Sequence, residues 1–147
     1  MLSVIIEART AAERLPALLA QLTSGAVDGL VRQVLIVAEA GAPGIEDLCE
    51  ETGADPHPTI EAAGAAARAD WLLVLPADFR LRDGWIGALE HHLARGGEAL
   101  VTGVSDAGLF GRRPFGVLVE RRRLEGRRGA DLQRLRRDLG LGPRRIG

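Results

Sequence analysis

Three acidic residues, Glu7, Glu39 and Asp78, each stand at or just past the end of a short apolar run in the sequence. Short apolar runs of this kind are typical of strands buried in a parallel sheet. The carboxyl ends of parallel strands lie at one edge of a sheet, where open α/β proteins bind their ligands. Carboxylates gathered there would suit a divalent cation or the hydroxyl groups of a sugar. The alternative is that these acids only stabilise the first turns of the helices that follow.

The remaining pattern predicts the elements that would position these acids. Strands and helices are expected to alternate, which defines a single α/β domain with a mainly parallel sheet flanked by helices. The expected strands are 2–6, 34–37, 55–58, 71–75, 98–104 and 117–119, and the expected helices are 10–24, 43–53, 60–69, 83–92 and 131–139. Two prolines limit the segment 55–58 to an edge strand.

Several helix boundaries are predicted from single residues. Thr10 and Glu13 have the spacing of a capping box, in which a hydroxyl and a carboxylate satisfy free amides at a helix start. Gly25 is expected to end that first helix. Asp83 is expected to cap the helix 83–92. Asp131 precedes the last expected helix, where it is either an N-cap or a residue with a chemical role.

Composition excludes several classes of protein. The 147 residues, 46% of them hydrophobic, predict one globular domain. No apolar run approaches the roughly 20 residues of a membrane helix, and the first residues lack a signal-peptide pattern, so we expect a cytoplasmic protein. Cys49 is the sole cysteine, which excludes a cysteine metal cluster. The sequence contains no lysine, which excludes a phosphate-binding loop and Schiff-base catalysis.

The net charge of −1 hides two segments of opposite charge. Residues 1–111 carry seven arginines against sixteen acids, and residues 112–147 carry twelve arginines against four acids. The basic segment is expected to be solvated or paired with the acidic body, or to meet an anionic acceptor or a membrane surface. Nucleic acid is not expected as a partner, because Phe115 is the only aromatic residue within this segment.

Five segments, in order, resemble the inverting glycosyltransferases of family 2. The segment Val4–Thr10 looks like the V-I-I-P-x-x-N opening of that family, and Trp71–Asp78 resembles the strand that ends in its D-x-D motif. The other similar segments are Val34–Gly41 (the V-V-D-x-G-S-T-D loop), Ala62–Asp70 (the N-x-G-x-x-x-A-x-G-D helix) and Ala130–Arg137 (the late E-D-x-x-L-x-x-R-L helix). Together they cover most of the chain.

This resemblance implies a GT-A fold, a nucleotide-diphosphate sugar donor and a divalent metal, Mg²⁺ or Mn²⁺. It places Glu7, Arg9, Glu39 and Asp78 at the donor, with Asp78 as a metal ligand, and it makes Asp131 the general base. In such a reaction a metal neutralises the leaving diphosphate while the base deprotonates an acceptor hydroxyl. It also divides the chain into a donor-binding core, residues 1–111, and an acceptor-side segment, residues 112–147.

Two departures from the family pattern favour a different function. Ala38 stands where the family has the aspartate that contacts the base of the nucleotide, and Pro76 replaces the first acid of the D-x-D motif. The alternative is therefore a relative without catalytic activity that binds a sugar or a protein partner through the same crevice.

Overall fold

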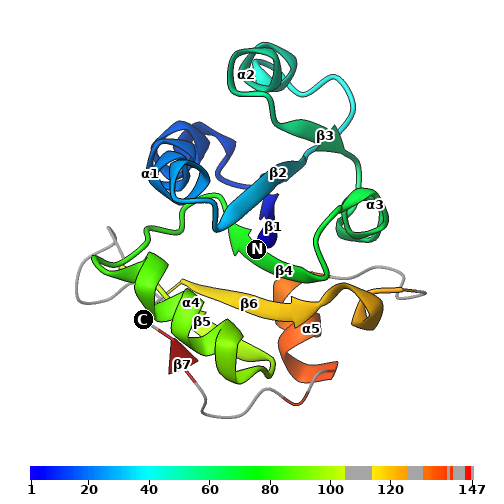
Figure 1. The fold of residues 1–147 in the computed structure, drawn as a ribbon. Coiled ribbons are helices and arrows are strands. Elements are labelled where there is room, and N and C mark those ends of the chain that lie inside the picture. Colours follow the sequence, from blue (N-terminus) through cyan, green and yellow to red (C-terminus); the bar gives the residue numbers. More distant parts are fainter. Residues whose placement is uncertain (105–113, 126–130, 139, 141–144, 147) are drawn as a thin grey trace.

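A computed structural model describes residues 1–104, 114–125, 131–138, 140 and 145–146, which form three layers with helices on both faces of a sheet (Figure 1). The strands are β1 (Leu2–Glu7), β2 (Val31–Val37), β3 (Asp55–His57), β4 (Trp71–Pro76), β5 (Ala99–Thr102), β6 (Phe115–Glu120) and β7 (Arg145–Ile146). The α-helices are α1 (Leu15–Val27), α2 (Ile45–Thr52), α3 (Ile60–Ala66), α4 (Trp85–Arg95) and α5 (Leu132–Asp138), and two short 3₁₀ helices are η1 (Ala12–Arg14) and η3 (Arg121–Arg123).

The sheet has the strand order β3-β2-β1-β4-β6-β5-β7. The first four of these strands are parallel, β6 is antiparallel to both β4 and β5, and β7 is parallel to β5. The expected α/β class and mainly parallel sheet are thus confirmed. The expected edge strand with two prolines is also present, because β3 lies at one end of the sheet.

The antiparallel β6 has a glycine, Gly116, as its second residue. A Cβ atom on Gly116 would lie 2.4 Å from Leu75 Cδ2 and 3.2 Å from the carbonyl oxygen of Val74. A larger residue here would displace the Leu75 side chain and crowd the Val74 carbonyl. Residues 115–120 of the basic segment therefore lie inside the sheet, between β4 and β5.

Two apolar cores hold the layers together. The helices α1, α2 and α4 pack on one face, through residues such as Leu18, Cys49 and Leu89. The helices α3 and α5 pack on the other face, through Ile60 and Leu135 (Figure 1). In the described residues no helix is both long and apolar enough to cross a membrane.

Three of the helix boundaries predicted from single residues are wrong. Thr10 and Glu13 form no capping box, because α1 begins after η1 without a side-chain cap. Gly25 lies inside α1 rather than at its end. The ring of Trp85 packs against Gly25, and a Cβ atom on Gly25 would lie 2.4 Å from Trp85 Cη2. Asp83 does not cap α4, whose N-cap is Gly84 in a left-handed conformation.

Candidate functional site

The parallel register brings the three predicted acids to one edge of the sheet. Glu7, the last residue of β1, is paired with Val37 of β2 on one side and with Pro76 of β4 on the other. Glu39 and Asp78 each follow their strand by two residues, so the loops that carry them flank the end of β1. The chain runs from β1 outward to β2 and β3 and then returns to β4 on the other side of β1. This is a topological switch point, the usual ligand crevice of open α/β sheets.

Backbone hydrogen bonds extend the parallel pairing one residue beyond the strands. The amides of Ala8, Ala38 and Ala77 donate to neighbouring segments at 2.8, 3.0 and 3.1 Å respectively. All three alanines are buried. The loops therefore leave the sheet from fixed positions, which holds the residues that follow at the edge.

Glu7 and Arg9 form an ion pair at the switch point. The Nε atom of Arg9 donates to both carboxylate oxygens of Glu7, at 2.8 and 3.0 Å, and the backbone amide of Arg9 donates to Oε1 at 2.9 Å. Arg9 Nη2 makes a further contact with Oε2. This hydrogen bonding raises the pKa of Arg9, and burial opposes it. The pair fixes the guanidinium beside the end of β1.

Two more acids lie within electrostatic reach of this pair, since Glu61 and Asp131 also raise the pKa of Arg9. Glu61 belongs to the first turn of α3. Asp131 is the N-cap of α5: its Oδ1 accepts the amide hydrogen of Arg134 at 2.7 Å. The expectation of an N-cap is confirmed, and the residue is exposed.

The loop after β4 is tied to the loop after β1. Arg80 donates from Nη1 to its neighbour's carbonyl, Phe79 O, at 2.7 Å, and from Nη2 to the carbonyl of Arg14 at 3.1 Å. Asp78 lies between two buried residues, Ala77 and Phe79, and is itself exposed. The loop after β1 also contains Ala11, whose φ of 56° makes it a non-glycine residue in the left-handed region. Backbone strain of this kind often collects at functional sites.

The residues of the site do not fit a metal held by the protein. Among the described residues no group of three or more His, Cys, Asp or Glu side chains could hold a metal ion. Asp78 supplies one carboxylate, and Pro76, at the position of the family's other acid, has no side-chain ligand atom. Mg²⁺ is commonly bound by one or two carboxylates together with substrate phosphates, so Asp78 alone would be a minimal ligand.

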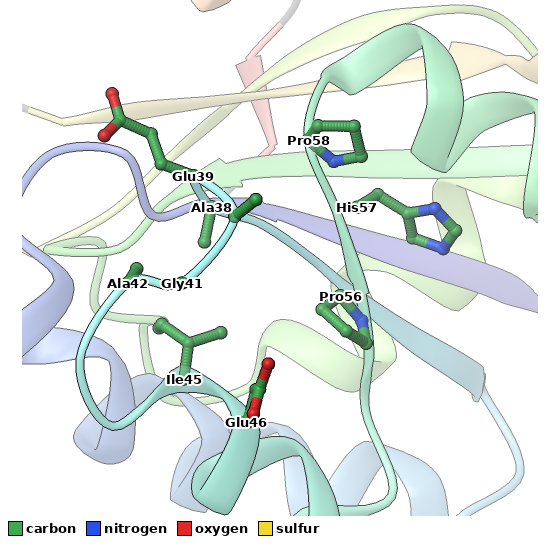
Figure 2. A pocket seen from close by; sticks show the side chains of 10 residues that line it. Ala38, Glu39, Gly41, Ala42, Ile45, Glu46, Pro56, His57 and Pro58 are labelled. Atoms are coloured by element: carbon green, nitrogen blue, oxygen red, sulfur yellow. The ribbon is translucent and has the colours of Figure 1, made fainter.

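A pocket of about 270 Å³ opens at the ends of β2 and β3 (Figure 2). Its apolar walls come from the loop after β2, from the start of α2 and from the prolines of β3 and the residues after it. Its lining residues are Ala38, Glu39, Ala40, Gly41, Ala42, Ile45, Glu46, Pro56, His57 and Pro58. The loop turns through Gly41 and Gly44, whose φ angles of 78° and 77° favour glycine. For this reason α2 begins at Ile45, two residues later than expected.

The two carboxylates that line this pocket differ in direction. Figure 2 shows the side chain of Glu39 pointing outward, away from Pro56 and Pro58, whereas the carboxylate of Glu46 points from the start of α2 toward Pro56. The ring of His57 points away from the loop that carries Glu39. Glu46 is thus an exposed acid whose carboxylate is directed toward the proline wall of the pocket.

Sequence reasoning found part of this arrangement. It anticipated Glu7, Glu39 and Asp78 at one edge and Asp131 at a helix start, and the structure places them so. It missed Glu46 and Glu61, which both lie in the first turns of helices. A signal for Glu46 existed, because it follows the second strand and a glycine-rich turn.

The described arginines of the basic segment mostly meet acids of this chain. Arg136 instead lies over the ring of Phe115, 5.1 Å from its centre. The ion pairs are Arg121 with Asp70 (3.6 Å), Arg122 with Glu120, Arg123 with Glu98 (3.5 Å) and Arg134 with Asp138 (3.7 Å). Asp70 and Glu98 belong to the acidic body, so the pairs of Arg121 and Arg123 agree with the internally paired alternative. An anionic acceptor or a membrane surface stays a prediction.

Comparisons with known proteins give the class of fold. No protein-family model and no curated protein matches the sequence. Among solved structures, the chain is similar to glucosyl-3-phosphoglycerate synthase from Mycobacterium tuberculosis, solved with Mn²⁺, UDP and glucosyl-3-phosphoglycerate (18% identity, TM-score 0.53, 69% of this chain and 42% of that one). It is also similar to mannosyl-3-phosphoglycerate synthase from Rubrobacter xylanophilus (20% identity, TM-score 0.54, 69% and 39%).

A third similar structure aligns with nearly the whole chain. It is 4-diphosphocytidyl-2C-methyl-D-erythritol synthase from Anaerococcus prevotii (9% identity, TM-score 0.59, 99% of this chain and 86% of that one). This chain spans only about two-fifths of the two phosphoglycerate synthases. At such identities the likeness establishes the fold. It is the GT-A-like α/β fold that nucleotide-sugar transferases and cytidylyltransferases share.

Proposed function

We propose that this protein binds a nucleoside-diphosphate sugar at the carboxyl edge of its sheet and transfers the sugar to an acceptor hydroxyl. The observation that carries the proposal is the pocket beside the switch point, at the ends of β2 and β3. A similar fold solved with UDP and Mn²⁺ supports it.

The pocket suits the base of the nucleotide. Pockets for whole small-molecule ligands measure about 300–1,000 Å³. A pocket of about 270 Å³ therefore holds only part of a nucleotide sugar, and its walls at Ile45, Pro56 and Pro58 suit a flat apolar ring. The diphosphate and the sugar would then extend toward the end of β1.

Arg9 is the group we assign to the diphosphate. A guanidinium has five N–H donors, and the pair with Glu7 uses two of them, on Nε and Nη2. The remaining donors suit phosphate oxygens, for which the planar guanidinium is well shaped. Glu7 holds the guanidinium in place before the ligand arrives, which lowers the entropy cost of binding.

Asp131 is the group we assign as general base. Its carboxylate takes the proton of the acceptor hydroxyl, whose oxygen then bonds to the anomeric carbon of the sugar. The bond from that carbon to the diphosphate oxygen breaks, and the nucleoside diphosphate leaves with the electron pair. The cap to Arg134 fixes the orientation of the carboxylate. We assign no step to a metal, since the described residues do not form a metal site.

A second function is favoured by Pro76, which stands where the family pattern has an acid. In this function the protein binds the nucleotide sugar, or a partner, without transferring the sugar. Asp78 would then contact a sugar hydroxyl rather than a metal.

Both functions include binding of a nucleotide sugar. Thermal unfolding with UDP-, GDP- and dTDP-sugars, with and without Mn²⁺, tests this binding. A ligand at one hundred times its Kd stabilises the protein by about 2.7 kcal/mol, which raises the Tm of a chain of this size by about 5–10 °C. Absence of a shift with every donor at millimolar concentration would refute nucleotide-sugar binding.

Chromatography of the donor after incubation with the protein separates the two functions. Release of free nucleoside diphosphate, by transfer or by slow hydrolysis, supports the transferase. A donor that binds and stays intact with sugar and hydroxyl acceptors supports the binding function and contradicts the role of Asp131.

A further inference from the structure

The pocket at the end of β2 contains a carboxylate that the family pattern does not assign. Glu46 lies in the first turn of α2, lines the pocket, and points toward Pro56 (Figure 2). The acid that the resemblance expects at position 38 is a buried alanine here, 6% exposed. The pocket therefore has a carboxylate, but it enters from the helix rather than from the strand.

The chemistry of a carboxylate limits which base it can read. An ionised carboxylate only accepts hydrogen bonds, and its two oxygens can accept from two donors side by side. Guanine has such a pair, the N1–H and N2–H₂ groups on one edge. Uracil has one N–H between two carbonyl oxygens, which repel a carboxylate. Adenine and cytosine each have one amino group beside a ring nitrogen that accepts.

The other walls of the pocket do not offer a competing pattern. Its remaining side chains are apolar apart from Glu39 and His57, and Figure 2 shows both of these pointing away from the space between the loop and the prolines. The amide of Ala38 donates to the carbonyl of His57, and the amide of Ala42 donates to the carbonyl of Glu39. These backbone donors are therefore occupied. Among the side chains that line the pocket, Glu46 is thus the charged group directed toward the proline wall.

We propose that Glu46 is the specificity-determining residue of the base pocket and that it selects guanine, so that the donor is a GDP-sugar. This inference rests on the proposed function, because it takes the pocket to be a nucleotide site. It names the class of donor, which the fold alone leaves open.

Calorimetric titration of the full chain with GDP, UDP, CDP and ADP tests the inference. The bidentate pair predicts that GDP binds about ten-fold or more tightly than the other three. Glu46→Gln replaces one acceptor oxygen by a donor group, so the preference for GDP over UDP should fall by about ten-fold.

Asp47→Asn is the matched control, because Asp47 shares the first turn of α2 but does not line the pocket. It makes the same change of charge at the start of α2, and it should retain the preference for GDP. Circular dichroism checks that both variants are folded.

Each outcome of the titration decides the inference. Preference for GDP that E46Q abolishes and D47N retains supports it. Equal binding of the four nucleotides, or a preference that survives in E46Q, overturns it and leaves nucleotide binding intact. Binding of none of the four overturns both the inference and the proposed function.

Discussion

Arg9 donates to the carboxylate of Glu7 from its backbone amide and from its guanidinium, although the two residues are only two positions apart. Glu7 ends β1 at the switch point of the sheet, and its side chain is 13% exposed. The contact joins the loop after β1 to the last residue of the strand. It places a cation where the crevice begins.

Arg9→Gln should weaken nucleoside-diphosphate binding by about ten-fold, because hydrogen bonds to charged groups contribute about 1.5–3 kcal/mol and tenfold corresponds to 1.4 kcal/mol. The free energy of unfolding should fall by about 1 kcal/mol at most, since the pair is partly exposed to solvent. Calorimetry and urea unfolding measure the two effects. The control is Arg68→Gln, at the opposite end of the sheet, where the Arg68 amide bonds to Gln33. Unchanged nucleotide affinity in R9Q would contradict the role of Arg9.

Two substitutions of Asp131 separate its structural role from its proposed chemical role. Asn is as good an N-cap as Asp, so Asp131→Asn should keep the free energy of unfolding within about 0.5 kcal/mol, whereas Asp131→Ala should lower it by about 1 kcal/mol. Both variants lack a base, so sugar transfer should slow by about 10²–10⁴-fold in each. Transfer by D131N at the wild-type rate would show that Asp131 is only a cap.

Gly25→Ala should destabilise the protein even though alanine favours helices. A Cβ at this position would lie 2.4 Å from Trp85 Cη2 and 2.8 Å from Val31 Cγ2, and crowding of this kind costs about 1–3 kcal/mol. Gly87→Ala is the control within α4, because nothing lies within 4 Å of a Cβ there. It should stabilise the protein by up to about 1 kcal/mol. Urea unfolding of the two variants checks the contrast, and a stabilised G25A would contradict the packing of α4 on α1.

The stability of the protein should fall as the pH rises above about 8.5. Burial raises the pKa of the Cys49 thiol, with smaller contributions from Asp55 and Glu46. An unfolded thiol ionises near pH 8.5, so above that value the unfolded chain loses a proton that the folded chain keeps. The sequence has no lysine or tyrosine, and arginine stays protonated, so no other side chain titrates between about pH 9 and 11.

Cys49→Ala provides the comparison for this pH dependence. The variant should be less stable at every pH because it leaves a cavity, but its free energy of unfolding should not change between pH 8.5 and 10. Urea unfolding across that range measures the slope. Equal slopes in the two proteins would show that the thiol is not the cause.

The sequence by itself determined the class of fold and the edge at which the site lies. Apolar runs followed by acids predict strands and the loops at their ends, because burial requires an apolar strand whatever its neighbours are. The α/β alternation, the edge strand with its prolines and the N-cap at Asp131 were all predictable from local pattern.

Only the tertiary structure decided which side chains meet. The wrong boundary at Gly25 depends on Trp85, a residue sixty positions away, and the position of β6 depends on the space beside Gly116. In the same way Glu61 and Asp131 came within electrostatic reach of Arg9, and Glu46 rather than Glu39 came to point toward Pro56. Packing between elements sets these relationships, and local sequence does not encode the direction in which a loop or helix presents its side chains.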